Sequence, residues 1–346
     1  MYDNMKIRCN AYCLPDFKTD NLVEKKGIFE ETRGQNYYKL FNPDNFTGNY
    51  LKITPPKKDD YYPALKIEGS IRKWYLGNTI NDLSKFEYED AWRQVFNLLE
   101  ISQCKMQYFN IVKAEIGLNV AVKKTCYEIE RVILGYKSNC YINKSTKGEG
   151  CKFKAKHFSI KLYNKVEEII APFKNKRIKT YEEKAILKEY ENKNILRIEF
   201  TISGGKSKIY DKFHYCTLAD SIIHFDSSYI FFWNSLLDLQ FDLNWGDDLI
   251  FNPEGKTIKE LKDFLLIASI HRESLETIKQ WSKKMKHSRK VLYSIQNLLR
   301  NNSFANNNYG EKEFFHDIKI QMIYSMQKSK CIIGNVKKLV RRKVAA

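Results

Sequence analysis

The sequence predicts an α+β fold in which a strand-rich region, residues 1–205, precedes a smaller and mostly helical region, residues 206–346. Short segments in the first region alternate apolar and polar side chains, which is the pattern of strands with one buried face. Beyond Gly204-Gly205 the apolar side chains recur at helical spacing instead. The length of 346 residues and the hydrophobic content of 43% are enough to bury a core.

The first strands are predicted at Met5–Cys13, Tyr50–Thr54 and Ala64–Ile71. The segment Lys18–Asn45 is polar and irregular, and it predicts no regular element. Glu89–Ile101 predicts a helix, because its apolar residues follow the i, i+3, i+4, i+7 spacing. The residue that caps this helix is expected to be Asp82 or Ser84.

Three longer strands are predicted at Tyr108–Val122, Lys156–Lys165 and Ile195–Ser203. Each has an apolar face and a polar face, since strand side chains alternate in direction. Glu115 lies in the middle of the first polar face, and Glu199 lies in the middle of the third. The polar face of the second strand carries Lys161, Tyr163 and Lys165.

The remaining segments are mainly helical. Helices are predicted at Cys126–Leu134, in most of Val166–Lys193, and at Leu218–Asp242, Thr257–Leu299 and Phe314–Lys330. Tyr136–Gly150 is rich in turn residues. A C-terminal basic cluster lies within the longest helical segment and consists of Lys283, Lys284, Lys286, Arg289 and Lys290.

The chain carries 59 Lys and Arg against 41 Asp and Glu, a net charge of +18 spread along its length. A folded protein this basic is expected to bind a polyanion, most often nucleic acid. We find no membrane-spanning run and no signal peptide, so the eight cysteines are expected to be reduced thiols in a cytoplasm. P-loop, G-x-S-x-G, H-E-x-x-H and Rossmann motifs are absent from the sequence, which argues against those enzyme classes.

The two mid-strand glutamates form the first chemical candidate. Two carboxylates on half-buried strand faces repel each other, and a divalent cation such as Mg²⁺ or Mn²⁺ would relieve the repulsion. His157 and Asn119 are the further candidate ligands of this metal. The alternative is an ordinary ladder of ion pairs, in which Glu115 pairs with Lys161, and Glu199 pairs with Arg197 or a lysine.

Tyr163 is the candidate nucleophile. A tyrosine that attacks phosphate forms a phosphotyrosine ester, whose bond energy is kept for later rejoining of the strand. Lys161 or Lys165 would stabilise the charge that develops in this reaction. The alternative is a structural tyrosine on an amphipathic strand whose lysines face solvent.

Five segments resemble, in order and spacing, those of a known family. They are Tyr2–Lys6, Leu65–Asn78, Val112–Asn119, Ser159–Lys165 and Leu196–Glu199, and together they cover roughly the first 205 residues. On these segments the chain resembles the filamentous-phage gene II and gene X family of replication initiators, which phages and small plasmids encode.

The resemblance implies metal-dependent nicking of one origin strand by a tyrosine, with a 5′-phosphotyrosine intermediate and later rejoining. It implies a central antiparallel sheet like that of other tyrosine nicking endonucleases, with Glu115 and Glu199 as metal or active-site carboxylates. Many relatives in this wider class hold metal with a His-x-His pair, which the sequence lacks. A carboxylate-rich site is therefore expected, and Tyr136, Tyr141 and Tyr210 stay open as alternatives to Tyr163.

The implied partners are origin DNA, the host replication helicase and the host polymerase, in the bacterial cytoplasm. Residues 1–205 would form the nicking domain, and residues 206–346 would help to hold origin DNA. The cations predicted to bind DNA are the C-terminal basic cluster and Arg72, Lys73, Lys113 and Arg197. The rival hypothesis is a non-catalytic, sequence-specific DNA-binding protein of a phage or plasmid.

Overall fold

The computed structural model describes residues 1–19, 22, 28–32, 36–45, 47–57, 60–78, 81–123, 125–126, 129, 133–136, 143–144, 150–174, 180–241 and 309–328. The chain divides into two compact units. The larger unit takes its described residues from 1–131, 135–239 and 317–328, and the smaller unit takes them from 133–134, 240–241 and 309–316. The predicted functional boundary near residue 205 remains a prediction.

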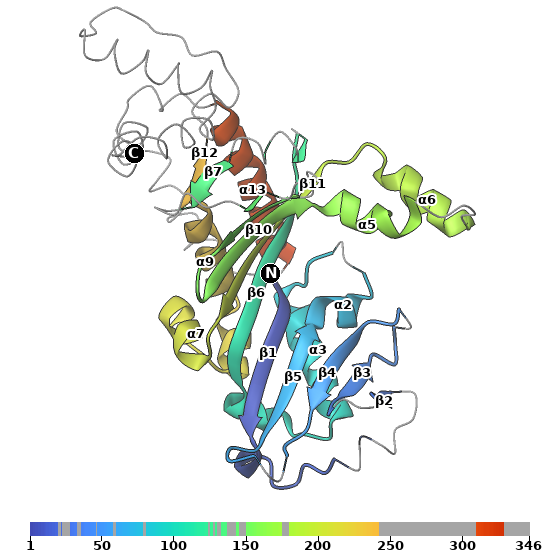
Figure 1. Ribbon diagram of the computed structural model, residues 1–346, viewed down its shortest axis with the longest axis vertical. Coiled ribbons are helices and arrows are strands. Elements are labelled where there is room, and N and C mark those ends of the chain that lie inside the picture. The colour runs from blue at the N-terminus through green and yellow to red at the C-terminus, as the bar shows by residue number, and fades with distance from the viewer. Residues whose placement is uncertain are drawn as a thin grey trace, which may run out of the picture. The chain divides into compact units, whose positions relative to one another are not determined.

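Ten of the described strands form one sheet in the larger unit, and every pairing between them is antiparallel. The order is β2-β3-β4-β5-β1-β6-β11-β10-β9-β8, much of which can be followed in Figure 1. The strands are β1 (Tyr2–Asn10), β2 (Phe29–Glu31), β3 (Tyr38–Phe41), β4 (Tyr50–Thr54), β5 (Ala64–Ser70), β6 (Asn110–Ala121), β8 (Asn143–Lys144), β9 (Cys151–Lys154), β10 (Phe158–Asn164) and β11 (Ile195–Ser203). The predicted α+β fold with a central antiparallel sheet is confirmed.

Helices flank this sheet. Those described are α2 (Ile71–Leu76), α3 (Lys85–Leu98), α5 (Lys165–Lys174), α6 (Tyr181–Tyr190), α7 (Lys206–Phe213), α8 (Leu218–Ile223), α9 (Ser227–Leu236) and α13 (Tyr309–Lys328), with 3-10 turns at Ala11–Cys13 and Gln103–Tyr108. Ser84 caps α3, because its hydroxyl accepts from the Glu87 amide while the Glu87 carboxylate accepts from the Ser84 amide. Of the two predicted caps, Ser84 is confirmed.

Some local predictions differ from the structure. Lys18–Asn45 contains β2 and β3, which are too short to show a clear alternation. The prediction of a helix at Cys126–Leu134 is wrong at its C-terminal end. Strand β7 (Ile133–Tyr136) begins at Ile133 and pairs with β12 (Leu239–Phe241). The helix predicted at Leu218–Asp242 is two helices followed by β12. The helical prediction for Thr257–Leu299 lies outside the described residues.

Helices α3 and α9 pack on the apolar face of the sheet. Tyr2 of β1 stacks on Tyr88 of α3, with 4.9 Å between ring centroids. Phe200 of β11 meets Phe232 of α9 edge to face, at 5.1 Å. All four rings are fully buried, so this face forms the core and the opposite face carries the polar side chains.

Among the described helices, none is long and apolar enough to span a bilayer.

Candidate active site

Three carboxylates gather on the polar face of three neighbouring strands. Asp3 comes from β1, Glu115 from β6 and Glu199 from β11. One carboxylate oxygen from each lies within 4.8 Å of the others. All three residues are at most 9% exposed. We refer to these residues as the acidic group.

A β-bulge brings Asp3 to this face. Between Tyr2 and Met5, β1 has one residue more than the paired stretch of β6 from Ile116 to Ala114. Tyr2 and Met5 therefore both enter the apolar core, and the extra residue lets Asp3 turn its carboxylate towards the polar side. Sequence analysis missed Asp3, although it lies in the first segment of the family resemblance, because the first strand was predicted at Met5–Cys13, whereas β1 begins at Tyr2 and ends at Asn10.

Arg197 of β11 is the centre of the charge network around the acidic group. Its side chain is fully buried. Its guanidinium nitrogens contact Asp3 at 2.8 Å, Asp82 at 2.8 Å, Glu199 at 3.1 Å and the amide oxygen of Asn119 at 3.3 Å. Asp82 also accepts a hydrogen bond from the Asn119 backbone amide at 3.2 Å, so it is a member of the network rather than a helix cap.

Gly117 makes room for this guanidinium. It is the cross-strand partner of Glu199, and a Cβ at position 117 would lie 2.5 Å from one Arg197 terminal nitrogen. Any side chain there would displace the guanidinium from its carboxylate partners. A glycine in the middle of a strand is often explained by such a close approach.

Arg72 of α2 is also buried, at 1% exposed, and its guanidinium lies 2.6 Å from Asp3. Arg72 and Arg197 were both predicted to contact DNA. The structure directs both guanidinium groups to buried carboxylates instead of to solvent. Asp3, Asp82 and Glu199 are the carboxylates that contact these two arginines.

Tyr163 of β10 joins the acidic group through its hydroxyl, which donates to Glu199 at 2.8 Å. Lys161, two residues earlier on the same face, lies 3.7 Å from the other Glu199 oxygen, and its side chain is 38% exposed. The structure thus brings together the predicted nucleophile, one predicted lysine and both predicted glutamates. The alternative of an ordinary ladder of ion pairs is met in part. Glu199 pairs with Arg197, as that alternative predicts, but Lys161 pairs with Glu199 rather than with Glu115.

The other predicted site residues lie around this centre. Lys165 is buried, with its amine 2.8 Å from Glu168 and 5.8 Å from the centre of the Tyr163 ring. Lys73 pairs with Glu168 at 3.7 Å. Lys113 lies two residues before Glu115 on β6, and its cross-strand partner is Lys6 of β1. His157 lies beside Gly204 and is not part of the acidic group.

The alternative tyrosines are placed elsewhere. Tyr136 donates its hydroxyl to Asp238 at 3.3 Å, and Tyr210 is 53% exposed on α7. Tyr163 differs from both, because its hydroxyl is bonded directly to a member of the acidic group. Tyr141 and the C-terminal basic cluster lie outside the described residues.

Burial and neighbouring charge shift the titration of the site. Burial raises the pKa of Glu115 to about 7, and the nearby charges of Glu199 and Asp3 add to this shift. Burial also raises the pKa of Tyr163, with Glu199 adding to it. For Asp3, burial acts to raise the pKa, but the charges of Arg72 and Arg197 outweigh it and hold the pKa well below its usual value.

Glu115→Gln is expected to stabilise the metal-free protein above neutral pH. Since the folded-state pKa of Glu115 is raised, the folded protein binds more protons than the unfolded chain, and stability falls as pH rises from 4.5 to about 7. Glutamine cannot ionise, so the variant does not lose this stability in this pH range. Near pH 8 its free energy of unfolding should therefore exceed that of the wild type by about 1 to 3 kcal/mol. Urea denaturation with a chelator, at about pH 5 and about pH 8, measures the difference.

Glu68→Gln on neighbouring β5 is the control for this experiment. Glu68 pairs with Lys6 at 2.9 Å, but its side chain is 34% exposed, so its removal should change the stability little. An equal gain for Glu115→Gln at both pH values would contradict the assignment of the pH dependence to Glu115.

The acidic group fits a divalent cation. Its three residues offer hard oxygen ligands, which suit Mg²⁺ or Mn²⁺. Burial raises the pKa of Glu115, and the charges of Glu199 and Asp3 add to that shift, so a bound cation would relieve the repulsion between these carboxylates.

Comparison with known proteins identifies a relationship. The Phage CRI family model, which describes the N-terminal part of a phage replication-associated protein, matches residues 1–229. The match includes every residue of the acidic group, Arg197 and Tyr163. A search of curated proteins found no match.

Proposed function

The chain belongs to the Phage CRI family of replication-associated proteins, whose members are rolling-circle replication initiators, and from this premise we propose that it nicks and rejoins one strand of origin DNA with Tyr163 as the nucleophile. The observation that carries the proposal is the 2.8 Å hydrogen bond from the Tyr163 hydroxyl to Glu199. This bond joins a phenol to the acidic group, on strands within the matched range.

In the proposed nicking step, the Tyr163 oxygen attacks the scissile phosphorus. A bond forms between that oxygen and phosphorus, and the bond from phosphorus to the 3′ oxygen breaks. Glu199 accepts the phenol proton, and the same proton is then passed to the departing 3′ oxygen, which leaves as a 3′ hydroxyl. Attack by a 3′ hydroxyl on the phosphotyrosine reverses these bond changes and rejoins the strand.

Asp3, Glu115 and Glu199 would hold the divalent cation. When bound, the cation would polarise the scissile phosphate and lower the cost of the charge that builds on its oxygens. Arg197 is a positioning residue in this proposal, because it holds Asp3 and Glu199 from the buried side. Lys161 stands at the exposed side of Glu199, where its amine can neutralise a phosphate oxygen.

The strand registers suggest a path for DNA across the polar face. Lys52, Glu68, Lys6 and Lys113 are successive cross-strand partners from β4 to β6. Lys161 and Lys152 are partners on β10 and β9. Lys113 of the first row lies two residues before Glu115 on β6, and Lys161 of the second row is the cross-strand partner of Glu199, so the lysines of both rows can contact phosphates near the scissile one.

Incubation of the protein with a supercoiled origin plasmid tests the proposal. With Mg²⁺ or Mn²⁺ we expect a relaxed plasmid and protein attached to a 5′ end, and with a chelator we expect neither product. Binding should weaken steeply as the salt concentration rises, because phosphate contacts release counterions. Intact binding without a nick under any metal condition would refute the enzyme and favour the non-catalytic DNA-binding protein.

A further inference from the structure

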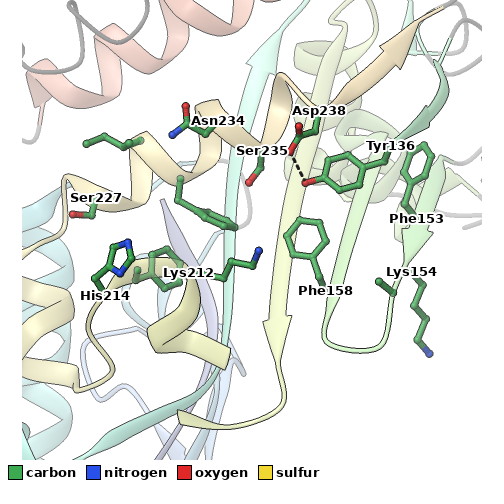
Figure 2. Close-up of a pocket in the computed structure, with 14 residues that line it drawn as sticks. Tyr136, Phe153, Lys154, Phe158, Lys212, His214, Ser227, Asn234, Ser235 and Asp238 are labelled. Atoms are coloured by element: carbon green, nitrogen blue, oxygen red, sulfur yellow. Dashed lines mark hydrogen bonds between the residues drawn. The ribbon is translucent and has the colours of Figure 1, made fainter. Parts of the chain in front are cut away.

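A pocket of about 960 Å³ lies in the larger unit, among β9, β10, α7, α9 and Tyr136 of β7, as Figure 2 shows. We propose that this pocket binds a nucleotide, with its base against the aromatic side chains and its phosphate beside Lys212. The choice of ligand rests on the proposed action on DNA. The volume is within the range of small-molecule sites in proteins, roughly 300 to 1,000 Å³.

Aromatic rings form one wall of the pocket. The rings of Tyr136 and Phe158 stack with 5.5 Å between centroids and 25° between planes. Phe231 meets Phe158 edge to face, at 6.4 Å. Phe158 and Phe231 are only partly buried, so they leave aromatic surface open to a ligand. A flat, aromatic ligand such as a nucleobase can stack on such a wall, with a gain in affinity of about tenfold for each stacked base.

Polar groups line another side of the pocket, along the C-terminal part of α9 and just beyond it. They are Asn234, Ser235 and Asp238, and Asp238 accepts the hydrogen bond from Tyr136. An amide, a hydroxyl and a carboxylate together provide both donors and acceptors for the edge of a base. An apolar wall with a few convergent polar groups is typical of a site for a small ligand.

Positive charge completes the pocket. Lys212 and Lys154 line it and are both exposed, and Figure 2 shows the Lys212 side chain reaching from α7 towards Phe158. His214 also lines the pocket and has a φ of 61°, a left-handed conformation that is uncommon outside glycine. Two lysines against one carboxylate favour a ligand that carries phosphate.

The pocket is separate from the acidic group. Phe153 and Phe158 point to the apolar side of β9 and β10, whereas Lys161 and Tyr163 point to the polar side. Nucleotide binding in the pocket can therefore be measured without any nicking step. The nucleotide has two sources, an unpaired position of a DNA strand or a free nucleoside phosphate.

Two probes distinguish these sources. One is an oligothymidine of about 16 nucleotides that carries 5-iodouracil, and the other is free thymidine 5′-monophosphate. Fluorescence anisotropy measures binding of the oligonucleotide to the full-length protein in chelator, and titration calorimetry measures binding of the mononucleotide. Lys212→Gln is compared with Lys206→Gln, which removes the same charge from an exposed residue of α7 that does not line the pocket. Phe231→Leu tests stacking, with its unfolding temperature as a check on folding.

Lys212→Gln and Phe231→Leu are expected to weaken oligonucleotide binding about tenfold, and Lys206→Gln less than about twofold. Ultraviolet crosslinking should attach the iodouracil to a peptide that contains Phe158 or Phe231. Weakened binding of the oligonucleotide alone supports a strand nucleotide, and weakened binding of both probes supports a free nucleotide.

Equal effects of Lys212→Gln and Lys206→Gln, or crosslinks confined to peptides outside the pocket, would overturn the pocket proposal. The same measurements on Tyr163→Phe protein should be unchanged, because no covalent step is involved. A protein that keeps these pocket effects but never nicks DNA would refute the proposed function and leave the pocket intact.

Discussion

Tyr163→Phe is expected to abolish the covalent protein–DNA adduct and to slow nicking by at least about a thousandfold, because the substitution removes the atom proposed to attack phosphorus. The ring and its place beside Lys165 are retained, whereas the hydrogen bond to Glu199 is lost. DNA binding should therefore stay within about twofold of the wild type. A denaturing gel of end-labelled origin DNA measures the adduct, and plasmid relaxation measures the nicking rate.

Tyr136→Phe and Tyr210→Phe are the matched controls for this experiment. Each removes one phenol from the larger unit, one of them bonded to Asp238 and the other exposed on α7, and neither residue belongs to the acidic group. Both variants should form the adduct at the wild-type level. An adduct that persists in Tyr163→Phe and disappears in one of the controls would move the nucleophile to that tyrosine. Tyr141→Phe completes the set, since the sequence alone leaves that residue open.

The faces of the central strands could be predicted from the sequence. Two-residue alternation around Glu115 in β6 and along β10 and β11 places Glu115, Tyr163 and Glu199 on polar faces, and they are found there. The alternation does not give the register between strands. That register makes Lys161 the partner of Glu199 and aligns Tyr163 with Arg197, and it is set by pairings across the whole sheet.

The rest of the site depends on features that a linear pattern does not contain. Asp3 reaches the acidic group through a one-residue bulge, which reverses the side that alternation assigns. The pattern also gives the direction of a side chain and not its burial. Arg197 was therefore predicted to contact DNA. Its guanidinium instead occupies the space that a side chain at position 117 would fill, and it pairs there with Asp82.

Arg197→Met is expected to destabilise the protein by about 3 to 5 kcal/mol at neutral pH, because it leaves buried carboxylates without their compensating charge. Methionine fills much of the same volume, so the loss would reflect charge more than a cavity. Asp3, Asp82 and Glu199 all contact the guanidinium, and each side chain is at most 9% exposed. Urea denaturation measures the change in the free energy of unfolding.

Arg93→Met is the control for the loss of an arginine. Arg93 pairs with Glu89 within α3, but the two side chains are 51% and 31% exposed, so this pair should contribute less than about 0.5 kcal/mol. A similar cost for both variants would contradict a special role of Arg197. The cost of Arg197→Met should also shrink at acid pH, where protonation neutralises the orphaned carboxylates.

Gly117→Ala separates the position of the guanidinium from its charge. This variant keeps every charge of the network, but its Cβ would lie 2.5 Å from an Arg197 nitrogen and force the guanidinium away from its partners. If the network stabilises the site through contact geometry, Gly117→Ala should reproduce a large part of the loss seen in Arg197→Met. If Gly117→Ala is neutral, the guanidinium can move while it still compensates the carboxylates, and Arg197 acts as a charge rather than as a fixed scaffold for Asp3 and Glu199.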